Sequence, residues 1–267
     1  MHTAYLKAAE DLRDNPGQWA AYESAGNCVV LAGPGSGKTK TLTIKLARML
    51  AEDVKDPRGI ACITYSNECA RELRHRLQDL GIEESSRVFI GTIHSFSLKN
   101  IVAPFAATAG LQLPQTINIA TQEEQRSAFE NAVTHVLGSS ARAYQFTVPI
   151  HAYRRTHLDR NTAAWDEYPD FAAVIIDYET RLRNNGLIDF DDMMLIGLRL
   201  VESQQWIRRA LVAKFPILAV DEYQDLRVPL HRIVMSLCFQ AGARLRQTQT
   251  VLRHHGESRS FAALSAA

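Results

Sequence analysis

Two groups of residues in this sequence could bind a phosphate and activate water. The first is the stretch Ala32-Gly33-Pro34-Gly35-Ser36-Gly37-Lys38-Thr39, which follows a short apolar run. Backbone N–H groups of such a turn cradle phosphates, the lysine reaches the outer phosphates, and the threonine hydroxyl ligates the accompanying Mg²⁺. Ala32 stands where the strict motif has glycine. Because the turn lies between a strand pattern and a helix pattern, we expect a nucleoside triphosphate site instead of an ordinary glycine-rich turn.

The second group is Asp221-Glu222-Tyr223-Gln224-Asp225, which follows the apolar run 215–220. Adjacent carboxylates at the carboxyl end of a strand are where a phosphate-loop enzyme holds its metal ion and its base. We expect Asp221 to hold Mg²⁺ through water, and Glu222 to orient and deprotonate the attacking water. The alternative, an acidic surface turn, is disfavoured because the apolar run directs the acids inward.

Strand and helix patterns alternate around these two groups of residues. Short apolar runs predict strands, the first of them central, and amphipathic patterns predict helices between them. The expected strands are 28–32, 60–65, 88–93 and 215–220, and the expected helices include 39–51 and 68–80. This order predicts an α/β fold with a doubly wound parallel sheet. From about residue 98 to 208 amphipathic helices replace the strands, with caps at Thr121 and Asp189, which predicts an inserted helical subdomain.

The amino-acid composition limits the classes of protein to which this chain can belong. The chain has 267 residues, and its 30 basic and 29 acidic side chains give a net charge of +1, so any nucleic-acid binding must come from local patches. Its four cysteines form no C-x-x-C pair, which favours reduced, buried thiols. We find neither a signal peptide nor an apolar run long enough to cross a membrane, and expect a cytoplasmic protein.

Six ordered motifs resemble those of the UvrD/Rep-like superfamily 1 DNA helicases. They are Gln18, A-G-P-G-S-G-K-T, T-Y-S-N-E-C-A-R-E-L, G-T-I-H-S-F, G-L-I-D-F-D-D-M and V-D-E-Y-Q-D-L, spread over about residues 14–240. The resemblance implies a P-loop NTPase (RecA-like) sheet flanked by helices, with an inserted all-α subdomain. It divides the chain into a motor domain (1–97 and 209–245), the insertion (98–208) and an irregular tail (246–267). Members of the family use ATP to move 3′ to 5′ along single-stranded DNA and unwind duplexes.

The resemblance also assigns roles to individual residues. Gln18 would read adenine, residues 32–39 would hold the phosphates, and Thr39 and Asp221 would hold Mg²⁺. The expected catalytic residues are Lys38, Glu222 and Gln224, the last connecting the nucleotide to the DNA site. The expected DNA contacts are Thr64, Tyr65, Asn67, Thr92 and His94, with Tyr65 able to stack on a base. Arg71, Arg74 and Arg76 are either further DNA contacts or a solvated basic face.

The sequence departs from the family after Asp225. The family continues with a strand ending in G-D-x-x-Q-S-I-Y and a second motor domain, whereas this chain reads A-R-L-R-Q-T at 243–248. We interpret this as a truncation or a reading-frame change. Two functions compete: the ATP-binding portion of a helicase, inactive until a separate polypeptide supplies the second motor domain, or a standalone ATP- and DNA-binding module without useful hydrolysis. A third, an ATPase unrelated to nucleic acid, would make the DNA motifs coincidental.

Overall fold

The computed structural model describes residues 2–33, 35–111, 113, 117–160, 162–223, 228–239 and 250–253. By its internal contacts the chain forms two compact units, which we call the sheet unit (1–92, 213–226 and 244–267) and the helical unit (93–212 and 227–243).

No helix in the described ranges has the length and apolarity needed to cross a membrane. The four cysteines are free thiols, and Cys62 and Cys238 are buried.

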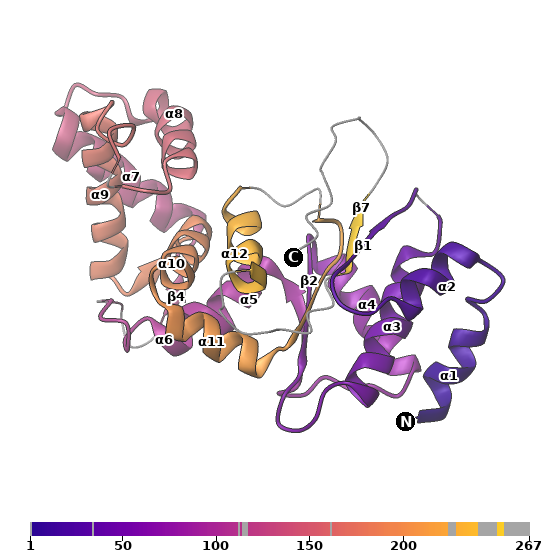
Figure 1. Ribbon diagram of the computed structural model, residues 1–267. Coiled ribbons are helices and arrows are strands. Elements are labelled where there is room, and N and C mark those ends of the chain that lie inside the picture. The colour runs from indigo at the N-terminus through magenta and orange to yellow at the C-terminus, as the bar shows by residue number, and fades with distance from the viewer. Residues whose placement is uncertain are drawn as a thin grey trace. The chain divides into compact units, whose positions relative to one another are not determined.

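The sheet unit contains a five-stranded parallel sheet in the order β1-β7-β6-β2-β3. Its strands are β1 (Cys28–Leu31), β2 (Ile60–Thr64), β3 (Val88–Thr92), β6 (Ile217–Val220) and β7 (Thr250–Arg253). Its helices are α1 (His2–Glu10), α2 (Pro16–Glu23), α3 (Lys38–Glu52) and α4 (Asn67–Asp79), seen in Figure 1. The predicted α/β fold with a parallel sheet is therefore confirmed.

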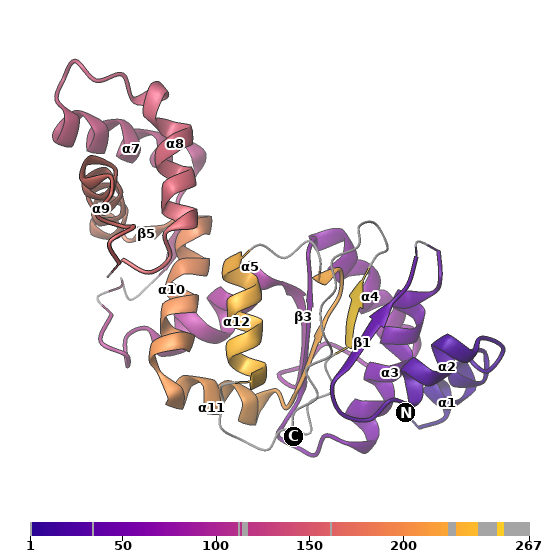
Figure 2. The same ribbon diagram turned by 45° about the horizontal axis from the view of Figure 1, so that its top comes forward.

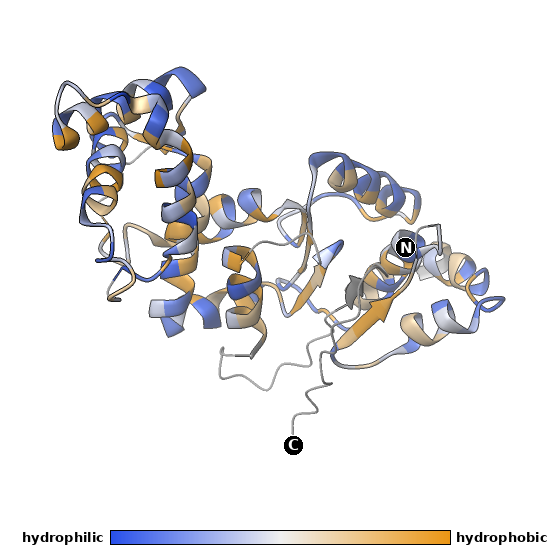
Figure 3. Cartoon of the chain, turned by 90° about the horizontal axis from the view of Figure 1, so that it is seen from above, coloured by the Kyte–Doolittle hydropathy of each residue, from blue (hydrophilic) through white to orange (hydrophobic). Residues whose placement is uncertain are grey.

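Apolar side chains of α3 and α4 cover the sheet. Leu46 of α3 and Leu73 of α4 are fully buried against Ile60 and Cys62 of β2. The coloured strands are mostly hydrophobic in Figure 3, whereas the helices carry both hydrophobic and hydrophilic residues. Burial of these apolar side chains stabilises the sheet, and the candidate site residues follow the carboxyl ends of its strands.

Two strand predictions need correction. The run 28–32 was expected to form a central strand, but β1 stands at one end of the strand order, and Val29 and Leu31 are 60% and 61% exposed. Hydropathy indicates that a strand is apolar but not which strands pair with it, since pairing is set by long-range contacts. Residues 250–253, expected in an irregular tail, form β7, whose backbone completes the ladder between β1 and β6. The remainder of the tail lies outside the described residues.

The helical unit is built mainly from helices, as Figure 2 shows for α7 to α10. Its elements are α5 (Ile93–Phe96), a π-helix η1 (Ser97–Val102), α6 (Ala103–Phe105), α7 (Gln122–Leu137), α8 (Ala143–Thr156), α9 (Pro169–Asn184), α10 (Phe190–Ser203), most of α11 (Gln205–Lys214) and α12 (Val228–Phe239). The capping box of Thr121 with Glu124 and the cap by Asp189 are confirmed. The expectation of an all-α subdomain misses one short parallel pair, β4 (Asn118–Ile119) with β5 (Leu187–Ile188). A pair of two-residue strands has no detectable periodicity.

The expected division of the chain differs from the compact units at α12. We expected 209–245 within the motor domain, but α12 packs on α10 in the helical unit, where Arg232 of α12 pairs with Glu202 of α10 at 2.6 Å. The interpretation of 98–208 as an insertion into a motor domain stays a prediction.

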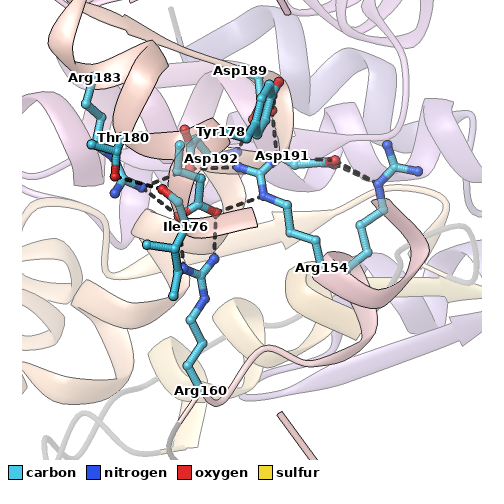
Figure 4. Close-up of polar contacts among 11 residues, drawn as sticks. Arg154, Arg160, Ile176, Tyr178, Thr180, Arg183, Asp189, Asp191 and Asp192 are labelled. Atoms are coloured by element: carbon cyan, nitrogen blue, oxygen red, sulfur yellow. Dashed lines mark hydrogen bonds and ion pairs between the residues drawn. The ribbon is translucent and has the colours of Figure 1, made fainter. Parts of the chain in front are cut away.

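A buried ion network organises the helical unit (Figure 4). Arg154 of α8 is 1% exposed and bonds Glu179 at 2.9 Å, Asp189 at 2.6 Å and Asp192 at 2.9 Å. The Tyr178 hydroxyl also donates to Asp189, at 2.8 Å. Two of these acids come from the G-L-I-D-F-D-D-M motif, so this motif joins α8, α9 and α10 through its carboxylates.

Candidate nucleotide site

The glycine-rich loop joins β1 to α3 and adopts the conformation that its glycines permit. Gly35 and Gly37 have φ angles of 71° and 79°, in the left-handed region that a side chain disfavours. Gly37 is the N-cap of α3, so the loop ends where the first N–H groups of that helix are available to an anion. Pro34 lies outside the described residues.

Hydrogen bonds hold the loop in this form. The Ser36 hydroxyl donates to the Gly33 carbonyl at 2.7 Å, and the Lys38 ammonium donates to the Ala32 carbonyl at 3.2 Å. The Gln18 side-chain amide donates to the Ser36 carbonyl at 2.6 Å. Although distant in sequence, Gln18 thus lies against the loop, as its expected role requires.

The acidic pair follows β6. Asp221 is 3% exposed, and its backbone N–H donates to the Ile63 carbonyl of β2 at 2.8 Å. Glu222 adopts a φ of 54°, which is unusual for a residue other than glycine. Its carboxylate lies 3.9 Å from the Lys38 ammonium, so the structure brings together the two groups separated in the sequence. The neighbouring Gln224 lies outside the described residues.

The environment of Asp221 disfavours an isolated negative charge. Burial, followed by the neighbouring Glu222 carboxylate, raises the pKa of Asp221 to about 6, against the opposing effect of Lys38. Its Oδ1 atom is buried without a hydrogen-bond partner among the described residues. A buried carboxylate oxygen without a donor fits a cation ligand, because hard cations such as Mg²⁺ prefer oxygen ligands. The Asp221 carboxylate and the Thr39 hydroxyl both offer oxygen atoms, which is the ligand type expected for the Mg²⁺ site.

The candidate DNA contacts of the sheet unit gather at the carboxyl ends of β2 and β3. Thr64 and Thr92 are paired in the β2–β3 register, and Tyr65 and Asn67 follow β2 directly. Tyr65 is 58% exposed, whereas Thr64 is fully buried and its hydroxyl donates to the Ser66 carbonyl at 2.8 Å. Thr64 therefore shapes the turn that presents Tyr65, and direct contact of these residues with DNA stays a prediction.

The remaining candidates have different surroundings. His94 belongs to the helical unit, where its ring lies 6.0 Å from that of Phe190, edge to face. On α4, Arg74 pairs with Glu84 at 2.5 Å and Arg76 pairs with Glu72 at 2.6 Å. Arg74 also donates to the Ile90 carbonyl of β3 at 3.0 Å. The solvated-face interpretation therefore fits Arg76, whose pair with Glu72 is exposed.

One residue beside the loop was not singled out from the sequence. Lys45, on α3, is 1% exposed and donates to backbone carbonyls at the end of α2. The available signal was its place within the apolar stripe of α3, next to Leu46 and one turn after Leu42. A lysine there indicates a buried polar contact, but the sequence does not identify its partner.

A parallel sheet with a glycine-rich loop after β1 and an acidic pair after β6 defines a P-loop nucleotide-binding protein. Residues 14–245 match the UvrD/REP helicase N-terminal domain, and the chain belongs to this family. It is similar to the ATP-dependent DNA helicase Rep of Escherichia coli, with 30% identity over 244 residues that cover 89% of this chain and 35% of Rep.

Two further comparisons agree. The Rep helicase of Salmonella typhimurium is 29% identical, with 86% of this chain and 35% of that protein covered. The ATP-dependent DNA helicase PcrA of Staphylococcus aureus is 26% identical, with 82% and 30% covered. The chain thus spans about a third of the length of these curated relatives.

Proposed function

We propose that this chain is the ATP-binding portion of an ATP-dependent DNA helicase that moves 3′ to 5′ along single-stranded DNA. The observation that carries the proposal is the meeting of the loop with the acidic pair, with Lys38 3.9 Å from Glu222. The helicase relatives support the class of reaction, and the direction of movement rests on the resemblance alone. We also propose a cytoplasmic location, in keeping with DNA processing.

The residues of the sheet unit have separate roles in binding and hydrolysing ATP under this proposal. Residues 32–39 and the first N–H groups of α3 hold the triphosphate, and Gln18 selects adenine. Thr39 and Asp221 hold Mg²⁺, which when bound neutralises charge on the phosphate oxygens. Glu222 orients the attacking water and accepts its proton. Gln224 is proposed to connect the nucleotide site to the DNA site.

The DNA strand is proposed to contact Thr64, Tyr65, Asn67, Thr92 and His94. Tyr65 offers an exposed ring on which a base can stack, a contact typically worth about 1–3 kcal/mol. The other four residues would contact the backbone or shape the turn. Because such binding releases counterions, it should weaken steeply with salt.

We further propose that these 267 residues alone bind Mg-ATP but hydrolyse it negligibly. An arginine finger contributes about 10³–10⁵ in turnover in phosphoryl-transfer enzymes, and the family supplies its arginines from the second motor domain. A separate polypeptide carrying that domain would restore turnover. If no such polypeptide restores turnover, the chain acts as an ATP- and DNA-binding module.

Equilibrium binding of Mg-ATP, with hydrolysis measured with and without single-stranded DNA, tests the proposal. Lys38→Ala should abolish Mg-ATP binding, and Glu222→Gln should retain it. Lys40→Ala is the matched control, because Lys40 lies on the same helix but pairs with exposed Asp11 at 3.1 Å.

The outcomes separate the candidate functions. Equal loss of binding in Lys38→Ala and Lys40→Ala would contradict the site. Normal ATP binding with no salt-dependent binding of single-stranded DNA would contradict the helicase assignment. DNA-stimulated turnover by the wild-type chain, lost in Glu222→Gln, would show that the chain is active alone and exclude the module without hydrolysis.

A further inference from the structure

Lys45 is a buried cation without a carboxylate partner among the described residues. It lies about two turns after Lys38 on α3 and is 1% exposed. Burying an ammonium group is unfavourable unless its N–H groups are satisfied. The chain therefore retains at this position a residue whose burial requires a specific set of acceptors.

Those acceptors all lie at the end of α2. Lys45 Nζ donates to the carbonyls of Ala21 and Ser24, both at 2.7 Å, and lies 3.4 Å from the Tyr22 carbonyl. It also donates to the Ser24 hydroxyl at 2.5 Å, which in turn donates to the Ala21 carbonyl at 2.8 Å. The last carbonyls of a helix lack partners within it, and a cation there is further favoured by the helix dipole. Lys45 thus caps α2 from the neighbouring helix.

The opposite end of α2 carries the residue expected to read the base. Gln18 lies in the first turn of α2, where Asn15 caps the helix by accepting from the Gly17 and Gln18 N–H groups. Its amide reaches the phosphate loop through the bond to Ser36. This bond uses one of the two N–H donors of the amide. The second donor and the carbonyl oxygen are the pair that an adenine edge requires.

Helix α2 has only 8 residues, so its own packing on α3 is limited. Figure 1 shows α2 beside α3, and the apolar contact between them centres on Tyr22 and Ile44, with Arg48 lying 4.3 Å over the Tyr22 ring. These contacts hold the face of α2 that packs on α3. The Lys45 bonds add a polar attachment of the last turn of α2 to α3.

We propose that Lys45 is a positioning residue of the nucleotide-base site: by tying the end of α2 to α3, it sets the distance of Gln18 from the phosphate loop and thereby the preference for adenine. This inference rests on the proposed ATP site and goes beyond it by assigning base selectivity to a residue that need not touch the nucleotide.

Competition binding on the full chain tests the inference with ATP, GTP and inorganic tripolyphosphate in the presence of Mg²⁺. Lys45→Met should lower ATP affinity about tenfold, the effect of roughly one hydrogen bond. It should lower tripolyphosphate and GTP affinity much less, because the Ser36 and Lys38 bonds within the loop remain, so the ATP over GTP preference falls. Lys40→Met, on the exposed side of α3, should change none of the three affinities.

Two milder variants guard against loss of folding. Ser24→Ala removes one acceptor of Lys45 and should also reduce the adenine preference. Lys45→Arg keeps the charge and the donors, so it should retain most of the wild-type adenine preference. Combining Lys45→Met with Gln18→Ala should add nothing to Gln18→Ala alone, because both act through one contact. Tripolyphosphate binding that falls much less than ATP binding reports a loop that still binds phosphate in each variant.

A pH profile gives a second readout. Burial lowers the pKa of Lys45 to about 8, so the adenine preference should decline between pH 7 and pH 9 in the wild type but not in Lys45→Arg. The other charged or titratable groups that influence or face it are Arg48 on α3, Asp53 at the C-cap of α3, Cys28 on β1 and Tyr22 on α2.

The inference is overturned if Lys45→Met weakens ATP and tripolyphosphate equally, or if it preserves the adenine preference that Gln18→Ala removes. The first result would mean that Lys45 only supports the fold. Absence of ATP binding by the wild-type chain would instead contradict the proposed function itself, so the two failures are distinguishable.

Discussion

Replacing Asp221 by asparagine should stabilise the folded protein while removing its metal site. Burial and the Glu222 carboxylate raise the pKa of Asp221 from 3.8 to about 6. A shift of about two units corresponds to about 3 kcal/mol of unfavourable free energy for the ionised carboxylate in the folded state. Asparagine keeps the shape and removes the charge, so at pH 7 the free energy of unfolding should rise by up to this amount.

The pH dependence gives the sign of the effect. The folded state holds the Asp221 proton more tightly than the unfolded state, so the contribution of Asp221 to stability falls as pH rises from about 4 to about 6. Well below pH 4 the carboxyl is protonated in both states, and the variant and the wild type should unfold alike. Above pH 6 the difference should be full and constant.

Thermal unfolding followed from about pH 2.5 to pH 8 measures this effect. For a domain of this size about 1 kcal/mol corresponds to about 2–4 °C, so Asp221→Asn should raise the midpoint by about 5 °C or more at pH 7. Asp79→Asn, an exposed carboxylate on α4, is the control and should shift it little. Mg²⁺ should raise the midpoint of the wild type but not of the variant. A variant less stable than the wild type at pH 7, or a difference that persists well below pH 4, would refute the reasoning.

Three further changes have defined outcomes. Gly37→Ala should weaken Mg-ATP binding, because a Cβ there would meet Gln18 Nε2 at 2.5 Å and because φ is 79°; unchanged affinity in a titration would contradict this loop geometry. Tyr65→Ala should weaken single-stranded DNA binding by about 1–3 kcal/mol without changing the melting temperature, since the ring is 58% exposed. Arg154→Met should destabilise the protein by about 3–5 kcal/mol in denaturant unfolding, because buried Glu179, Asp189 and Asp192 lose their common cation; a loss below 1 kcal/mol would argue against the network.

Local patterns in the sequence were sufficient for much of the sheet unit. Strand and helix periodicity, together with the Ser66 cap of α4, depend on residues close in the chain, and the structure places these elements within a few residues of expectation. Strand β6 begins at Ile217 and not at residue 215, because Pro216 lacks the N–H that a ladder position requires. The pairing of β7 with β1 and β6 could not be foreseen, since it joins backbone segments distant in the chain.

Residue types and local patterns were enough to predict which chemistry this protein can carry. A glycine-rich turn before Lys38, and carboxylates after an apolar run, specify phosphate and metal ligands through residue type and local backbone freedom. The arrangement of these groups in space depends on the folded structure. Desolvation of Asp221, the approach of Lys38 to Glu222 and the capping of α2 by Lys45 all depend on packing between distant segments. Burial and electrostatic energy are set by three-dimensional surroundings, which the order of residues specifies only through the complete fold.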